Sequence, residues 1–166
     1  MTDLANSILS SLQKELEEPI VGHYIIELGV FTGQSYRRDE DKNLKFEGLN
    51  NAELMFIHEN GAPTRNIPDR PVLDMTLKWA KDNIIPETLN RCYENLHKGN
   101  WTKDDIEREL KIMCQRIQQY ARDIIYINDG RLKANKPATI ERKGENHPLF
   151  DTGQLARSIR CRLIKL

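Results

Sequence analysis

The sequence predicts an α+β fold, in which a small curved β-sheet is packed by an N-terminal helix and a long helical hairpin, with a protruding charged loop. Apolar residues recur at helical spacing over residues 72–98 and 103–127, which a short turn separates. A β-rich apolar run covers residues 20–31, and apolar and basic residues alternate over residues 159–165. With 166 residues and 39% hydrophobic content, we expect one domain spanning residues 1–166.

The N-terminal part of the sequence predicts a helix followed by a strand. Leu4, Ile8, Leu12 and Leu16 recur every four residues, which predicts an amphipathic helix over residues 3–17. The run over residues 20–31 is almost continuously apolar, which is typical of a strand covered on both faces or engaged by a neighbour.

Residues 32–50 contain charges of both signs, which indicate a mobile loop or a protruding hairpin. We favour a solvated surface there over an arm that contacts a partner. Asn50 or Asn51 can then cap a short helix that Gly61 closes. Prolines at 63, 68 and 71 predict an extended linker that holds Arg70 rigidly.

The helical hairpin has marked ends. Pro86 predicts a kink or a break in the helix over residues 72–98, because it removes one backbone hydrogen bond. Thr102 and Asp105 form a predicted capping box at the start of the next helix. That helix carries an apolar seam at alternating spacings of four and three, made of Ile106, Leu110, Met113, Ile117, Tyr120, Ile124 and Ile127. We favour an antiparallel hairpin within one domain over an intersubunit coiled coil, because the connecting turn is short.

The C-terminal part predicts a turn and a last strand. A proline-anchored loop leads through the basic turn at residues 142–144 to Pro148, before which the chain is extended. Asp151 or Thr152 can cap a short helical turn over residues 153–157, with Gly153 allowing the bend. In the strand, Ile159, Cys161 and Leu163 alternate with Arg160, Arg162 and Lys165, which predicts one wet, basic face.

Composition excludes several classes of protein. The 25 basic and 25 acidic residues balance, which argues against a general nucleic-acid binder. Cys92, Cys114 and Cys161 are an odd number without short spacings, so we expect no disulfide framework, no metal site and a reducing compartment. No apolar run is long enough for a membrane span, so we expect a soluble protein made in the cytoplasm.

We find no constellation typical of catalysis, and we expect no enzyme and no cofactor. The four histidines are far apart, without a second ligand at metal-binding spacing. Asp151-Thr152-Gly153 is similar to the aspartic protease triplet, but a single copy would require a homodimer. A capping turn explains the same residues, although a dimeric aspartyl protease stays as an alternative. A nucleic-acid-binding module that uses Arg157, Arg160, Arg162 and Lys165 is another.

Four segments carry a resemblance to a known family. They are Ile57-His58-Glu59-Asn60-Gly61, Ile67-Pro68-Asp69-Arg70-Pro71, the pattern Asn-x-Pro-Ala-Thr-Ile-x-x-Lys-Gly from Asn135, and the pattern Pro-Leu-x-Asp-Thr-Gly-Gln-Leu-x-x-Ser-Ile from Pro148. In this order they resemble the neck, tail-completion and virion-morphogenesis proteins of tailed phages and prophages, over about two thirds of the chain.

The resemblance implies a structural virion protein, made in the host cytoplasm, that forms a ring, commonly a hexamer, between the portal side of the head and the tail tube. It implies heterologous contacts between neighbouring copies, with DNA passing through the lumen without sequence-specific binding and no membrane. A tail terminator subunit is the alternative within this class. The assembly residues implied are Ile67, Pro68, Arg70, Pro71, Pro148, Leu149, Asp151, Thr152, Gly153, Leu155 and Ser158. We expect shape and capping roles for them, with Arg70 the candidate for a bidentate ion pair.

Overall fold

The computed structural model describes residues 22–31, 38–39, 44–45 and 48–166. The predicted helix over residues 3–17 and most of the predicted charged loop lie outside these residues. The α+β class is confirmed. The elements are β1 (Tyr24–Gly29), β2 (Arg38–Asp39), β3 (Leu44–Lys45), α2 (Asn51–Asn60), the 3₁₀ turn η2 (Pro63–Arg65), α3 (Val72–Asp82), α4 (Ile84–His97), α5 (Lys103–Tyr126), α6 (Pro137–Lys143), α7 (Gln154–Ser158) and β4 (Arg160–Lys165).

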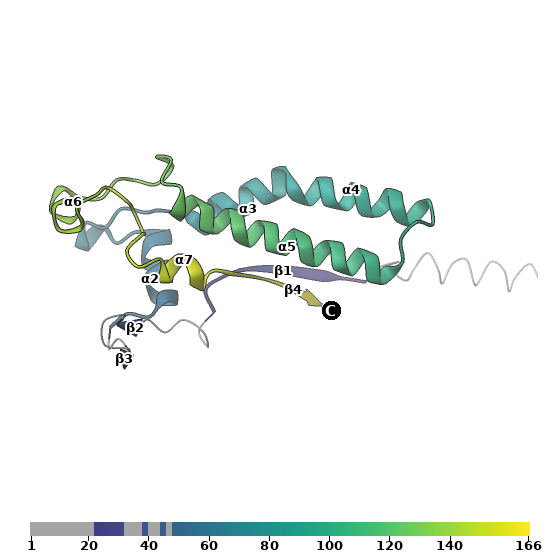
Figure 1. The fold of residues 1–166 in the computed structure, drawn as a ribbon, viewed down its shortest axis with the longest axis horizontal. Helices are drawn as coiled ribbons and strands as arrows, with labels where there is room; N and C mark the ends of the chain where they lie inside the picture. The colour runs from purple at the N-terminus through teal and green to yellow at the C-terminus, as the bar shows by residue number, and fades with distance from the viewer. Residues whose placement is uncertain (1–21, 32–37, 40–43, 46–47) are drawn as a thin grey trace, which may run out of the picture.

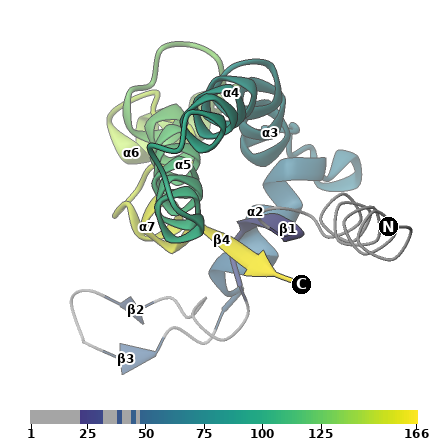
Figure 2. The ribbon, with the colours of Figure 1, turned by 90° about the vertical axis from the view of Figure 1, so that its right-hand side faces the viewer.

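The sheet under α5 is an antiparallel pair of strands from the two ends of the described chain. β1 pairs with β4, so that Tyr24 lies opposite Lys165 and Gly29 opposite Arg160. Figures 1 and 2 show α5 lying over this pair. On the other face Ile25 and Ile164 lie opposite each other and are 44% and 37% exposed, because the described residues cover only the α5 side. Of the two predicted alternatives for this strand, covered on both faces or engaged by a neighbour, the structure therefore shows the second.

The alternation predicted for the last strand needs one correction. Lys165 lies on the same side of β4 as Cys161 and Leu163, and its Nζ is 3.6 Å from Glu107 Oε2 on α5. Ile164, and not Lys165, therefore lies on the outer face with Arg160 and Arg162. The reason is the two-residue period of a strand, which puts residues 161, 163 and 165 on one face.

The predicted interruption at Pro86 is confirmed as a break into two helices. α3 ends at Asp82, and Asn83 lies between the helices with φ −125° and ψ −78°. Pro86 is the third residue of α4, where the missing N–H leaves no helical bond unmade. β2 and β3 form a separate two-residue antiparallel ladder, away from the helical hairpin of α3, α4 and α5. This arrangement agrees with the predicted protruding loop.

Helix α5 is buried on two sides. Its seam packs on α3 and α4 through Ile106, Met113 and Ile117, each at most 2% exposed, which confirms the hairpin within one chain. The seam is wrong at Ile127, which follows the last turn of α5 and is 61% exposed. The helix also buries Cys114, Ala121 and Ile125. The predicted capping box is confirmed, since Thr102 and Asp105 each accept from the other's backbone N–H.

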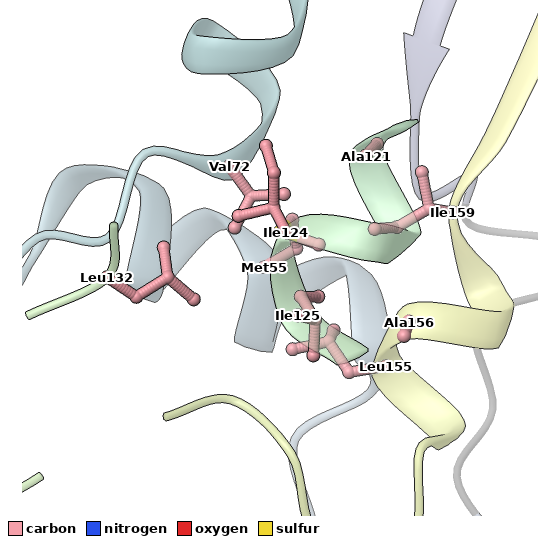
Figure 3. Packing of buried hydrophobic residues seen from close by; sticks show 9 residues of the cluster. All are labelled: Met55, Val72, Ala121, Ile124, Ile125, Leu132, Leu155, Ala156 and Ile159. Atoms are coloured by element: carbon pink, nitrogen blue, oxygen red, sulfur yellow. The ribbon is translucent and has the colours of Figure 1, made fainter. Parts of the chain in front are cut away.

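The core consists of two clusters that share α5. The first cluster, in Figure 3, contains Met55, Val72, Ala121, Ile124, Ile125, Leu132, Leu155, Ala156 and Ile159. The second cluster contains Ala80, Ile84, Cys92, Ile106, Leu110, Met113 and Ile117. The first cluster lies where α2, α3, α5 and α7 meet, and it supports the candidate site.

Candidate functional site

A cleft of about 330 Å³ opens where α2, α6 and two loops meet. The first loop, residues 62–71, contributes Ile67, Pro68 and Arg70. The second loop, residues 144–153, contributes Leu149, Phe150 and Asp151. In Figure 1, α6 lies at the far left and α2 lies further in, near α7. The structure thus brings together two segments that are far apart in the sequence and that the resemblance singles out.

The first loop folds back on itself. Ala62 N donates to Ile67 O at 2.9 Å, and Ile67 N donates to Ala62 O at 3.0 Å, which forms an isolated antiparallel bridge. The prediction of an extended linker is therefore wrong. Gly61 makes the fold possible, because it has φ 72° and ψ 173°, a conformation that is essentially limited to glycine. A Cβ at Gly61 would lie 2.9 Å from Asp69 N.

Helix α2 fixes both ends of this loop. The predicted cap at its start is confirmed and lies at Asn50, whose Oδ1 accepts from Ala52 N at 2.9 Å and Glu53 N at 3.0 Å in a capping box with Glu53. At its end, the carboxylate of Glu59 accepts from Leu73 N at 3.1 Å and Asp74 N at 2.8 Å. These N–H groups belong to the first turn of α3, which otherwise lacks partners for them. Glu59 therefore caps α3 from the preceding helix.

Arg70 joins the first loop to the chain that follows α5. Its side chain is 95% buried, since 5% of the residue is exposed. Nε donates to Lys133 O at 2.7 Å, and Nη2 donates to Ala134 O at 2.9 Å and to Asn135 Oδ1 at 3.3 Å. Burial lowers the pKa of Arg70. Within the described chain the partners of Arg70 are carbonyl and amide oxygens and no carboxylate, so the bidentate ion pair stays a prediction for a contact with another molecule.

Helix α6 corrects the prediction of a loop at residues 137–143. Pro137 is its first residue and Gly144, with φ 79°, ends it, so the sequence carried the usual marks of a short helix. From the last turn, Lys143 Nζ donates to His147 O at 2.9 Å and to Phe150 O. Burial lowers the pKa of Lys143. Lys143 thereby holds the second loop in its curved shape.

Leu149 has a left-handed backbone conformation, with φ 60°. This conformation is uncommon for a residue with a side chain. It turns the chain so that Leu149 and Phe150 both pack against the first cluster. In an extended backbone one of these two adjacent side chains would face away from the core, so the left-handed turn is what lets both of them reach it. His147 Nε2 lies 2.7 Å from Ile125 O, and its ring stacks on Phe150 with centroids 4.5 Å apart.

The start of α7 differs from the prediction as well. Gly153, with φ 75°, occupies the N-cap position, and no side chain caps the helix. Asp151 and Thr152 are exposed. Leu155 is buried in the first cluster, and Ser158 Oγ donates to Leu155 O at 2.6 Å. The capping role proposed for Asp151 and Thr152 is therefore wrong, and backbone freedom at Gly153 makes the turn instead.

The cleft includes about half of the predicted assembly residues. Those lining it are Ile67, Pro68, Arg70, Leu149, Asp151 and Leu155. Outside its lining lie Pro71, Pro148, Thr152, Gly153 and Ser158. Pro148 is fully buried, and Pro71 precedes α3. Both prolines therefore lie beside the cleft and not in its lining, and their role in shape stays a prediction.

Nine residues that line the cleft were not among the predicted assembly residues, and they include His58, Asn135, Lys136, Arg142 and Lys143. For Arg142 and Lys143 the available signal was their helical spacing from Thr139, which places the three side chains on one face of α6. Burial, together with the nearby Arg70 charge, lowers the pKa of His58 to about 4. His58 Nδ1 and Asn135 Nδ2 are buried without a hydrogen-bond partner in the described chain.

The cleft is cationic above an apolar floor. Arg70, Lys136, Arg142 and Lys143 line it, whereas Asp151 is the one acidic residue among the described residues around it. Leu54, Ile67, Pro68 and Leu149 supply apolar surface. Such a lining favours a ligand that combines an anionic group with an apolar one.

No metal-binding group of three or more His, Cys, Asp or Glu residues occurs within the residues that the structure describes. Asp151-Thr152-Gly153 forms a turn before α7, with Asp151 and Thr152 exposed. Among the described helices, none combines the length and the hydropathy that a bilayer span requires.

The basic residues of the last strand contact their own chain. Arg162 lies over the ring of Phe31 at 3.5 Å, and Arg160 Nη1 donates to Ile159 O at 3.0 Å. Lys165 faces Glu107 on the opposite side of the strand. They do not form the single basic face on which the nucleic-acid alternative depended.

Comparison of the chain with protein-family models, with curated proteins and with solved structures gave no match.

Proposed function

We propose that the protein is a structural subunit of a phage virion, which forms a ring at the neck and joins the portal side of the head to the tail tube. In this proposal the ring is a homo-oligomer, commonly a hexamer, located in the virion and without catalytic activity. A tail terminator subunit is the alternative within the same class of virion protein.

One observation carries the proposal: the four segments on which the resemblance depends meet at one end of the molecule. His58 from the first segment, Arg70 from the second, Asn135 from the third and Leu149 from the fourth line the same cleft. Arg70 also hydrogen-bonds Asn135 directly. Segments that must fit one another in this way support a shared role as a contact surface, since the described cleft lacks paired catalytic groups.

The test is assembly of the purified full chain. We expect sedimentation velocity to show a concentration-dependent oligomer, and electron micrographs to show rings that attach to purified tail tubes or to emptied heads. Attachment to tubes alone would favour the tail terminator. A chain that stays monomeric at all concentrations and attaches to neither particle would refute the proposal.

A further inference from the structure

The cleft contains a buried positive charge without a counter-charge. Arg70 is 5% exposed, and its hydrogen bonds go to uncharged oxygens. Its second terminal nitrogen, Nη1, makes no hydrogen bond within the described chain. A buried guanidinium costs free energy unless an anion compensates it. Arg70 lines the cleft, so an anion in the cleft is the group that could reach it.

The surroundings of Arg70 point to the same kind of ligand. Asn135 Nδ2 is a buried donor without a partner in the described chain, and Asn135 lines the cleft as well. Lys136 and Arg142 are exposed, line the cleft and form no ion pair within the described residues. Two unused donors and two rim cations match a carboxylate, which has two oxygens and accepts several hydrogen bonds.

The floor of the cleft argues for more than a small anion. Ile67, Pro68 and Leu149 are half-buried and line it, next to Leu54 and Phe150. An inorganic ion or a sugar-phosphate chain would leave this apolar surface uncovered. A peptide with a carboxylate side chain next to an apolar side chain would cover both parts. The volume of about 330 Å³ lies at the lower end of the range for ligand pockets.

We propose that the cleft binds an acidic, apolar peptide segment of a partner protein, with its carboxylate on Arg70, Asn135, Lys136 and Arg142 and its apolar side chain on Ile67 and Leu149. The identification of the partner as another virion subunit rests on the proposed function. The chemistry proposed for the peptide does not depend on it.

The experiment is an NMR titration of the full ¹⁵N-labelled chain with N-acetyl-Leu-Glu-Leu-amide. The expected result is saturable shifts of the amide signals of residues 67–70, 135–143 and 149–151. N-acetyl-Leu-Gln-Leu-amide lacks the charge and should bind at least about fivefold more weakly. The reason is that hydrogen bonds to an ionised group are roughly twice as strong as neutral ones. Equal binding of the two peptides, or no shifts in these residues, would overturn the proposal.

Two variants separate recognition from folding. Lys136→Gln/Arg142→Gln removes two exposed rim charges, so we expect a folded chain with at least fivefold weaker binding of the Glu peptide. Lys78→Gln/Lys81→Gln removes two exposed lysines of α3 and should leave binding unchanged. Arg70→Lys should weaken binding too, provided its amide spectrum shows a folded chain. Unchanged binding in the rim variant would refute the proposal.

Titration with sodium phosphate identifies the source of the anion. If phosphate produces the same saturable shifts as the Glu peptide, and the apolar side chains of the peptide add nothing, the cleft is a phosphate site and the proposal fails. If the Glu peptide binds as expected but the chain forms no rings, the proposed function fails and the peptide site stands. If the wild-type chain forms rings but does not bind the Glu peptide, the peptide site fails and the proposed function stands.

Discussion

Protonation of His58 couples the stability of the protein to pH. The folded protein holds the pKa of His58 at about 4, against 6.5 for the ordinary side chain, because the ring is partly buried and lies near the charge of Arg70. Between these values the unfolded chain takes up a proton that the folded chain does not. The contribution to stability is therefore complete above pH 6.5 and is lost as the pH falls toward 4.

The first prediction follows from this sign. On going from pH 7.5 to pH 5, we expect the wild-type chain to lose about 1 kcal/mol more stability than His58→Gln. This is roughly half of what the pKa shift gives over that pH range, because solvent screens a partly exposed ring. Urea unfolding curves at the two pH values measure it. His97→Gln, which changes an exposed histidine on α4, is the control and should behave like the wild type. Equal losses in the wild type and in His58→Gln would show that His58 does not carry the effect.

Leu149 and Asp151 are close in sequence but have opposite roles. Leu149 packs on the first cluster in a left-handed conformation, whereas Asp151 is exposed and caps nothing. We therefore predict that Leu149→Glu lowers the melting temperature clearly, at a cost of about 2 kcal/mol or more, because a charge replaces a half-buried apolar side chain. Asp151→Ala should change stability by about 0.5 kcal/mol or less.

Thermal unfolding followed by circular dichroism checks both variants. A loss of stability in Asp151→Ala as large as in Leu149→Glu would mean that Asp151 does cap the turn. The left-handed backbone at Leu149 explains why the sequence did not reveal this difference. Leucine gives no sign of a positive φ, as glycine and asparagine do, so the conformation depends on contacts such as those of Lys143 with the second loop.

At the scale of elements, the end of α2 decides the shape of the first loop. We predict that Gly61→Ala destabilises the protein by about 3 kcal/mol, because the new Cβ meets backbone atoms that cannot move aside and the backbone conformation is limited to glycine. Gly99→Ala is the control. Gly99 also has a positive φ, of 71°, but no atom lies within 4 Å of its added Cβ, so we expect about 1 kcal/mol. Denaturant midpoints compare the two, and equal losses would mean that the loop yields at Gly61.

The two ends of the predicted seam on α5 allow a matched test. Ile117 is fully buried between α5 and its hairpin partners, while Ile127 follows the helix and is exposed. Ile117→Asp should unfold the hairpin or cost about 4 kcal/mol or more, since a carboxylate would be buried without a partner. Ile127→Asp should cost about 0.5 kcal/mol or less. Far-ultraviolet circular dichroism in a urea series measures both, and similar values would mean that the helix extends past Tyr126.

Elements whose signals are local could be predicted well. The capping boxes at Asn50 and Thr102 and the break near Pro86 depend on residues within one or two turns, and all three are present. Helix α6 had equally local signals in Pro137 and Gly144, yet a short helix without a strong apolar stripe was missed. We predicted that a side chain caps α7. In the structure the N-cap residue is Gly153 in a left-handed conformation, and no side chain caps the helix.

At the scale of the whole molecule, the sequence predicted the α+β class because long periodic segments dominate it. The cleft could be predicted only in part, as two segments that belong together. What brings them together are contacts between residues far apart, such as Arg70 with Lys133 and Ala134, and Asn135 N with Asn146 Oδ1 in the second loop. No pattern along the chain shows which oxygen a buried guanidinium reaches, so the carbonyl partners of Arg70 could not be predicted.

The hydrogen bonds of Arg70 also set an order of events as the chain folds. They join residues 63 to 65 positions apart, whereas the α3, α4 and α5 hairpin forms from neighbours in sequence. Closing the longer loop has a larger entropy cost, so we expect the hairpin to form first and the Arg70 bonds after the transition state. Arg70→Gln should then speed unfolding and leave the refolding rate nearly unchanged in stopped-flow measurements of tryptophan fluorescence. A slower refolding rate with unchanged unfolding would reverse this order. If it holds, a newly made chain has its helical hairpin before it has a cleft, and partners that use the cleft can engage only finished molecules.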